Sequence, residues 1–356
     1  MNKRKINILV PGIFKSGGMK IIFEYACNLS ARGYDIIIYV PSVSYNYEKG
    51  TPDFRPKIRT VLRTIKNYTR SFSKFFNFQN IKISVVPVLN NYFIRDAYLS
   101  IATAWPTAYS LNNLSSDKGK KVYLIQDYEI WNSNIDKVDN SYRLPLERIT
   151  ISNYLHDFLN EKFNSDSTVI LNGLDYSMLN NTGKDYSKNE KTISFINYEN
   201  SRKNVETCLE VIKVIKDKYE NIKFISFGLE KYHQLPGYVK FYKCPSEAKI
   251  SDIYRETDIF LFLSKNEGFA LPPAEAMACK CAVITTNVGA VPEYSINNES
   301  AIFVSPTDLK DITDAVESLI NDNNKLKQIS GKGYTTVRNK LDWDNSIDKF
   351  EKTFLI

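Results

Sequence analysis

Short apolar runs alternate with amphipathic segments along most of this chain, and the alternation occurs in both halves. The apolar runs lie at 6–10, 36–40, 98–102, 122–125 and 149–152, and again at 192–196, 223–227, 259–263 and 282–285. Segments with helical periodicity lie between them, as at 19–32, 205–219, 250–257 and 309–326. This pattern predicts an α/β fold in which helices cover parallel strands.

The length of the chain predicts two domains. A chain of 356 residues exceeds the size at which a single hydrophobic core stops growing. Segment 180–191 is polar and holds Gly183 among several Lys, Asp and Asn residues, which is typical of a linker. We therefore expect two doubly wound α/β domains that are joined near this segment.

Composition argues against several classes of protein. With 43% hydrophobic and 24% charged residues, the chain is typical of soluble globular proteins. Its apolar runs are too short for a signal sequence or a spanning helix. The five cysteines are scattered and odd in number, which indicates a reducing compartment such as the cytoplasm. Only two histidines occur and the cysteines lack zinc-ligand spacing, so we expect no metal site and no cofactor.

Two glutamates mark the most informative segment, EGFALPPAEAMA at 267–278. Glu267 follows the apolar run 259–263, so we expect it on a loop above a strand. Glu275 follows two prolines, which are tolerated in the first turn of a helix. Backbone N–H groups at a helix start form a site for an anion. The segment therefore predicts two carboxylates beside an anion site.

This segment resembles the glutamate-pair signature of retaining nucleotide-sugar glycosyltransferases of family 4. The likeness extends from residue 6 to about residue 308 and is weakest between 41 and 82. It implies the GT-B fold, in which two doubly wound, Rossmann-like domains face each other across a cleft. The expected first domain is 1–178 together with a crossover helix at 343–356, and the expected second domain is 179–342.

The resemblance also implies roles for residues of the second domain. Lys203 matches the family's phosphate-binding lysine, while the family's partner arginine is Tyr198 here, so Arg202 is its candidate replacement. Glu267 would stabilise the positive charge that develops at C1 of the transferred sugar, and Glu275 would bind the ribose hydroxyls. Donor oxygens would be held by the backbone amides of Gly268, Phe269, Ala270 and Leu271. The alternatives are solvated cations at a helix start and, for Glu275, a helix-capping carboxylate.

Three segments of the first domain extend the likeness. Gly17 and Gly18 follow the first strand, where glycines let the backbone approach a phosphate, with a plain turn as the alternative. Segments 102–108 (ATAWPTA) and 126–129 (QDYE) are similar to those of the rhamnosyltransferase-like branch, which builds bacterial surface glycans. The histidine that many members carry near QDYE is missing, so Asp127 is the candidate for contact with sugar or acceptor. A capping aspartate in a turn is the alternative.

Segment 55–76 is basic and amphipathic. No Asp or Glu occurs between residues 54 and 95, and helical spacing places Arg63, Lys66 and Arg70 on one face, opposite an apolar face. Such a helix is typical of a contact with an anionic membrane surface. A surface helix that packs its apolar side on the domain is an equal alternative.

Together these features predict a metal-independent retaining glycosyltransferase of the cytoplasm, peripheral at the inner face of the membrane if segment 55–76 binds lipid. It would move a hexose from a nucleoside diphosphate sugar to a growing glycan or lipid-linked acceptor in surface polysaccharide synthesis. Rhamnose on dTDP is the first expectation, followed by UDP- or GDP-linked hexoses. The alternatives are a non-catalytic nucleotide- or glycan-binding GT-B subunit and a GT-B epimerase. The net charge of +7 comes with no nucleic-acid-binding motif, so no nucleic acid partner is expected.

Overall fold

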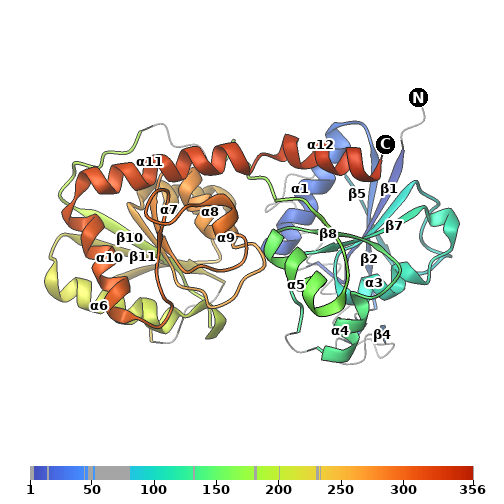
Figure 1. Ribbon diagram of the computed structural model, residues 1–356, viewed down its shortest axis with the longest axis horizontal. Coiled ribbons are helices and arrows are strands. Elements are labelled where there is room, and N and C mark those ends of the chain that lie inside the picture. The colour runs from blue at the N-terminus through green and yellow to red at the C-terminus, as the bar shows by residue number, and fades with distance from the viewer. Residues whose placement is uncertain are drawn as a thin grey trace. The chain divides into compact units, whose positions relative to one another are not determined.

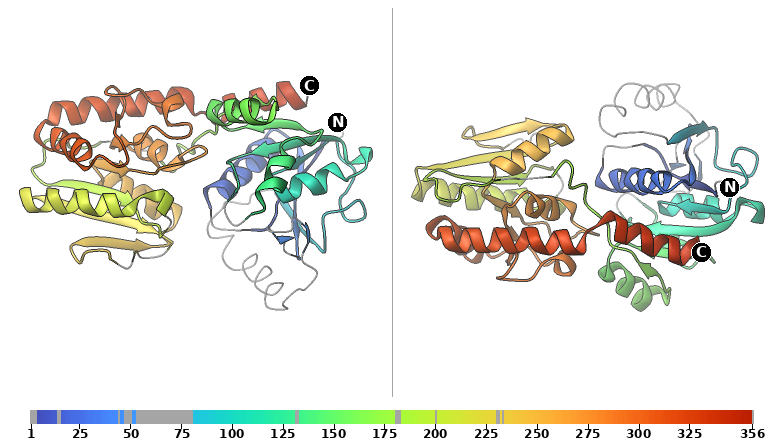
Figure 2. Two further views of the ribbon diagram at one scale, coloured as in Figure 1. Left: turned by 60° about the horizontal axis from the view of Figure 1, so that its bottom comes forward. Right: turned by 90° about the horizontal axis from the view of Figure 1, so that it is seen from above.

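The structure is a computed structural model that describes residues 4–13, 16–43, 45–46, 51–52, 81–130, 133–179, 183–199, 201–229, 232 and 234–355. The chain divides into two compact units. The first unit is Met1–Asn172 with Trp343–Ile356, and the second is Gly173–Asp342. Each unit is built on a parallel sheet with helices on both faces (Figures 1 and 2). The predicted α/β class with two Rossmann-like units is therefore confirmed.

The sheet of the first unit has the strand order β5-β2-β1-β6-β7-β8-β9, and neighbouring strands are parallel. Its strands are β1 (Lys5–Leu9), β2 (Asp35–Pro41), β5 (Lys82–Val86), β6 (Leu99–Ala102), β7 (Lys120–Ile125), β8 (Glu147–Thr150) and β9 (Thr168–Val169). A short antiparallel pair, β3 (Tyr45–Asn46) and β4 (Thr51–Pro52), lies outside this sheet. The strand order reverses between β1 and β6. Their carboxyl ends therefore form a topological switch point, where doubly wound sheets bind ligands.

Helices cover both faces of this sheet. They are α1 (Gly17–Ala31), α3 (Trp105–Asn112), α4 (Ile135–Ser141), α5 (Asn153–Phe163) and α12 (Trp343–Phe354), with a 3-10 turn at Ser116–Lys118. Buried residues of α3, α4 and α5 share one core with Leu9, Ala102 and Tyr123 of the sheet. The alternate strand residues Ile8 and Ile101 face α1 and α12 instead. The central strands are apolar on both faces, which is typical of buried parallel strands.

The helix α12 returns the chain to the first unit, where it lies beside α1 (Figure 1). The rings of Tyr25 and Trp343 meet edge to face with 5.0 Å between centroids. Arg32, which follows α1, binds three acidic side chains of α12. These are Asp344 at 3.1 Å, Glu351 at 2.7 Å, and Asp348. An arginine shared by several carboxylates ties α12 to α1 more firmly than a single exposed pair could.

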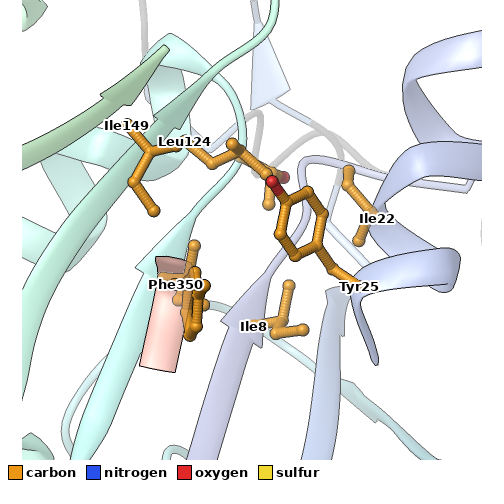
Figure 3. A pocket seen from close by; sticks show the side chains of 8 residues that line it. Ile8, Ile22, Tyr25, Leu124, Ile149 and Phe350 are labelled. Atoms are coloured by element: carbon orange, nitrogen blue, oxygen red, sulfur yellow. The ribbon is translucent and has the colours of Figure 1, made fainter. Parts of the chain in front are cut away.

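A small apolar pocket lies between the sheet and these two helices. Figure 3 shows the Tyr25 ring among Ile8, Ile22, Leu124 and Phe350. The Tyr25 hydroxyl is buried there and has no hydrogen-bond partner within the described residues. A buried polar group without a partner has lost its water and gained nothing in exchange. The hydroxyl therefore destabilises the folded protein.

The sheet of the second unit has the order β12-β11-β10-β13-β14-β15, also parallel. Its strands are β10 (Lys191–Ile196), β11 (Ile222–Gly228), β12 (Val239–Lys243), β13 (Ile259–Phe262), β14 (Ala282–Thr285) and β15 (Ile302–Phe303). Its helices are α6 (Val205–Lys218), α7 (Glu247–Glu256), α8 (Leu271–Ala278), α9 (Val291–Tyr294), α10 (Leu309–Asn321) and α11 (Asn323–Lys340). The strand order reverses between β10 and β13. The switch point of this unit therefore lies at their carboxyl ends.

Two sequence-based boundaries differ from the structure. The single helix expected at 309–326 is two helices, because Asp322 is extended and its side chain caps α11 by accepting from the amides of Asn324 and Lys325. The boundary between units lies at residues 172 and 173, ahead of the expected linker. The described part of that segment packs on the second unit, where Lys184 donates to the carbonyl of Lys280 at 3.0 Å.

The basic segment 55–76, with its proposed membrane-binding face, lies outside the described residues. Among the helices that the structure does describe, none combines the length and apolar character needed to cross a lipid bilayer.

Candidate functional site

The switch point of the second unit brings together two of the predicted residues. Lys203 ends the 3-10 turn Ser201–Lys203 between β10 and α6, and Glu267 follows β13. The Lys203 ammonium lies 2.5 Å from Oε1 of Glu267, and the Ser264 hydroxyl donates to the same oxygen at 2.6 Å. Glu267 is only 7% exposed. A buried carboxylate needs such partners, because desolvation alone would disfavour its charge.

Backbone contacts fix the two segments that carry these side chains. The amide of Lys265 donates to the carbonyl of Arg202 at 2.8 Å, and the Ser264 hydroxyl also reaches this carbonyl at 3.1 Å. The Arg202 side chain, the candidate replacement for the family arginine, is partly buried beside them. The loops after β10 and β13 therefore hold each other in register, which sets the position of Lys203 relative to Glu267.

A third loop, which follows β14, supports the backbone at Glu267. Gly289 has φ +53°, and a Cβ placed on it would lie 2.6 Å from the carbonyl oxygen of Glu267 and 2.9 Å from that of Gly268. Only glycine tolerates both this backbone conformation and this close approach. Thr286 of the same loop donates to the carbonyl of Ser264 at 2.5 Å. The loop therefore acts as a platform under the Glu267 segment.

The segment between Glu267 and α8 presents free backbone donors. The amides of Phe269, Ala270 and Leu271 donate to no acceptor within the described residues. Ala270 adopts a left-handed conformation with φ +65°, and the Tyr294 hydroxyl donates to its carbonyl at 2.6 Å. Left-handed backbone is costly for a residue other than glycine and persists only where its surroundings impose it. The loop is thus held in a shape that leaves three N–H groups at a helix start without a partner in the described part of the chain.

Glu275 lies one turn into α8. It is partly exposed, while Ala274 and Ala276 on either side are fully buried. The Tyr254 hydroxyl donates to its Oε2 at 3.3 Å. Burial raises the pKa of Tyr294 well above 10, and the charges of Glu267 and Glu275 raise it further. Both carboxylates therefore lie close enough to Tyr294 to raise its pKa, which places them around the same loop.

Tyr198, at the position of the family arginine, follows β10 and is 39% exposed. Its neighbour Asn197 is buried, and its side chain accepts from the amide of Tyr232 at 2.9 Å and donates to Ser226 at 3.3 Å. A Cβ at Gly228 would lie 1.9 Å from the carbonyl oxygen of Asn197, so β10 and β11 end in close backbone contact. Tyr198 thus presents an aromatic surface where the family presents a positive charge.

In the first unit, Gly17 and Gly18 form the first residues of α1, which Ser16 caps by accepting from the amide of Met19 at 3.2 Å. A Cβ on Gly18 would lie 3.3 Å from Oε1 of Gln126. The glycine pair and the QDYE segment are therefore neighbours at the carboxyl edge of the sheet. Asp127 is partly exposed there and accepts from the amide of Tyr128 at 2.8 Å.

Glu129 is a residue whose role the sequence did not indicate. Its Oε2 accepts from the amide of Trp105, the first residue of α3, at 2.8 Å. Burial raises the pKa of its carboxyl to about 8, the charge of Asp127 adds to this, and the Trp105 amide opposes it. Glu129 therefore keeps its proton at neutral pH, unlike an ordinary glutamate.

Within the described residues, no group of three or more His, Cys, Asp or Glu side chains is arranged to hold a metal ion.

Comparisons with known proteins agree with this arrangement. Residues 182–336 match the family described as "Glycosyl transferases group 1". The chain is 28% identical over 166 residues to the capsular polysaccharide biosynthesis glycosyltransferase CapM of Staphylococcus aureus, with 43% of each chain covered. It is 25% identical over 214 residues to the uncharacterized glycosyltransferase MJ1178 of Methanocaldococcus jannaschii, with 58% of each covered. The chain thus spans about half the length of these relatives.

Solved structures show the fold of the whole chain. Anabaena Alr3699/HepE, solved in complex with UDP and glucose, is similar with a TM-score of 0.74 at 14% identity, covering 98% of this chain and 99% of that one. Sucrose-phosphate synthase from Thermosynechococcus elongatus has a TM-score of 0.72 at 12% identity, with 98% of each covered. The two units therefore have the GT-B fold, and the match to the family described as "Glycosyl transferases group 1" covers most of the second unit.

Proposed function

We propose that this protein is a metal-independent retaining glycosyltransferase that moves a hexose from a nucleoside diphosphate sugar to a growing glycan or lipid-linked acceptor. The observation that carries the proposal is the cluster at the β10–β13 switch point. There a cation, a buried carboxylate and three amides at the start of α8, which have no acceptor among the residues that the structure describes, lie on adjoining loops. Sugar transfer from a diphosphate requires groups that neutralise the leaving group and stabilise the charge on the sugar.

In this proposal the diphosphate binds to Lys203 and to the amides of residues 268–271, with Arg202, Gly17 and Gly18 also contributing to donor binding. A phosphate oxygen competes with Glu267 for the Lys203 ammonium, because both are anions that accept charge-assisted hydrogen bonds. Donor binding therefore loosens the 2.5 Å contact between Lys203 and Glu267. Glu267 is then free to act on the sugar, and Glu275 accepts hydrogen bonds from the ribose.

The chemical step breaks the bond between C1 of the sugar and the diphosphate oxygen and forms one from C1 to the acceptor hydroxyl oxygen. We propose that the acceptor attacks from the face that the diphosphate leaves, which retains the anomeric configuration. The acceptor proton passes to an oxygen of the departing diphosphate, so no protein base is required. Glu267 stabilises the positive charge at C1, and Asp127 contacts the acceptor.

The donor and acceptor classes are part of the proposal. Rhamnose on dTDP is the first candidate, from the likeness of QDYE to the rhamnosyltransferase-like branch, and UDP- and GDP-linked hexoses follow. A UDP-bound solved neighbour and a relative named for capsular polysaccharide biosynthesis support a nucleotide-sugar enzyme of surface polysaccharide synthesis. We further propose a cytoplasmic location, which rests on the scattered cysteines, and a peripheral contact with the inner face of the membrane, which rests on the charge pattern of segment 55–76.

The experiment has two stages. Thermal shifts with dTDP, UDP, GDP and ADP identify the base, because a ligand that binds the folded state raises its melting temperature. Transfer or donor hydrolysis is then measured for the wild type and for Glu267→Ala. We expect the variant to lose about 100-fold or more of the rate. Lys203→Ala should also lower the rate. Its matched control is Lys218→Ala, which removes an exposed ion pair between Lys218 of α6 and Glu317 of α10.

The same experiment distinguishes the proposed glycosyltransferase from a second candidate function. Tyr198 in place of the family arginine favours a non-catalytic nucleotide-binding subunit. Such a subunit would bind one of the four nucleotides but show no turnover that depends on Glu267. A protein that binds none of them would contradict both functions.

A further inference from the structure

Tyr254 is a fully buried residue of α7 whose ring is fixed by aromatic neighbours. It meets Phe227 of β11 edge to face with 5.6 Å between ring centroids, and Phe260 of β13 in the same way with 5.4 Å. Edge-to-face pairs have a preferred geometry, and close-packed side chains stay in one rotamer. The Tyr254 hydroxyl is therefore held at one place in the unit.

That hydroxyl donates to Oε2 of Glu275 at 3.3 Å. Burial raises the pKa of Tyr254 well above 10, and the negative charge of Glu275 raises it further. The hydroxyl therefore remains a hydrogen-bond donor at any pH at which the protein is assayed. A separation of 3.3 Å is long for an O–H···O bond. Such bonds in empty active sites often shorten when the substrate binds.

Glu275 is partly exposed on α8, whereas Ala274 and Ala276 on either side of it are fully buried. A glutamate has three rotatable side-chain bonds, and fixing them on binding costs conformational entropy. A carboxylate accepts hydrogen bonds through both oxygens. A donor that holds Oε2 in advance removes part of this cost.

We propose that Tyr254 is a positioning residue that orients the Glu275 carboxylate for the ribose hydroxyls of the donor. The inference rests on the proposed function, in which Glu275 binds ribose. It adds that recognition of the ribose depends on a buried tyrosine that does not touch the nucleotide.

Calorimetric titration of the full chain tests this role. After dTDP, UDP, GDP and ADP have been titrated, the tightest binder is compared with its 2′,3′-dideoxy counterpart. The Kd of the dideoxy nucleotide divided by that of its parent measures what the ribose hydroxyls contribute. For dTDP, whose sugar already lacks the 2′-hydroxyl, this ratio measures the 3′-hydroxyl alone. We expect Tyr254→Phe to lower this ratio about fivefold or more, as loss of a hydrogen bond to a charged group would. The Kd of the dideoxy nucleotide should stay within about twofold of the wild-type value.

Two further variants test whether the change in the ratio comes from the contact between Tyr254 and Glu275. Tyr176→Phe removes another tyrosine hydroxyl of the same unit, which donates to the carbonyl of Val337 at 2.7 Å. It should leave the ratio unchanged even if it lowers the melting temperature. In a Glu275→Gln background, Tyr254→Phe should have no additional effect on the ratio, because the two residues act as one unit.

An unchanged ratio in Tyr254→Phe, or equal losses for both nucleotides, overturns the positioning role and leaves the proposed function standing. Failure of the wild type to bind any of the four nucleotides is a different result. It removes the proposed function, and the role of Tyr254 falls with it.

Discussion

The ammonium of Lys203 lies 2.5 Å from Oε1 of Glu267, although the two residues are 64 positions apart in the chain. The Lys203 side chain is 17% exposed and that of Glu267 is 9% exposed. Loss of one partner from a buried ion pair leaves the other charge without compensation, which costs more than loss of both partners. This relationship has a direct consequence for stability.

We expect Lys203→Met to lower the free energy of unfolding by about 1–3 kcal/mol, because Glu267 then stays buried without its cation. The double variant Lys203→Met with Glu267→Gln should recover at least half of that loss. Chemical denaturation of the wild type, of each single variant and of the double variant measures the difference. A double variant as unstable as the sum of the single variants would show that the two side chains do not interact.

We expect Gly289→Ala to reduce both stability and nucleotide binding. The new methyl group would lie 2.6 Å from the Glu267 carbonyl oxygen, and φ at this position is +53°. The backbone of Glu267 and Gly268 must shift, at a cost of about 1–3 kcal/mol. Gly237→Ala is the control, since a Cβ there meets no atom within 4 Å. The proposed platform is excluded if both variants bind nucleotide as the wild type does.

Glu129 predicts a pH-dependent loss of stability. Its carboxyl has a pKa of about 8 in the folded protein, against 4.5 as the ordinary value. Between these pH values the folded state holds a proton that the unfolded chain has released. The free energy of unfolding therefore falls as the pH rises through this range and levels off above it.

Glu129→Gln should remove this fall while keeping an oxygen for the Trp105 amide. The variant is expected to match the wild type near pH 5 and to exceed it in denaturation midpoint near pH 8. Glu161→Gln, an exposed change on α5 of the same unit, should leave the profile unchanged. Parallel profiles for Glu129→Gln and the wild type would contradict the raised pKa.

We expect Tyr25→Phe to raise the free energy of unfolding by about 1 kcal/mol, because it removes a buried hydroxyl that makes no hydrogen bond in the described structure. Tyr45→Phe is the opposite control. The Tyr45 hydroxyl pairs with Ser110 at 2.6 Å, so its removal should lower stability by a similar amount. Thermal or urea denaturation measures the change in stability of each variant. A Tyr25→Phe protein less stable than the wild type would contradict the prediction.

Much of the fold could be predicted from the sequence, because strands buried on both faces are continuous apolar runs. The run 282–285 coincides with β14, and 259–263 contains β13. The break at Asp322 was missed because one polar residue inside a long amphipathic pattern does not disrupt its periodicity. Only the extended backbone of that residue shows that its side chain caps a second helix.

The candidate site could be predicted in part. Lys203, Glu267 and Glu275 came from a resemblance, since nothing in their spacing tells that Lys203 and Glu267 meet. Ser264 carries no signal, because a serine after a strand is common in any sheet protein. The raised pKa of Glu129 comes from burial, and its hydrogen-bond partner Trp105 is 24 residues away in the chain. Burial by distant segments is a property of the tertiary structure, and a local pattern does not encode it.

Because α12 lies beyond the whole second unit in the chain, the first unit is discontinuous. During synthesis, the ribosome makes every residue of the second unit before it makes the partners of Arg32 and Tyr25. The first sheet therefore stays incompletely covered on one face until α12 has been made, whereas the second unit is continuous in the chain. The first unit is thus begun before the second unit and completed after it.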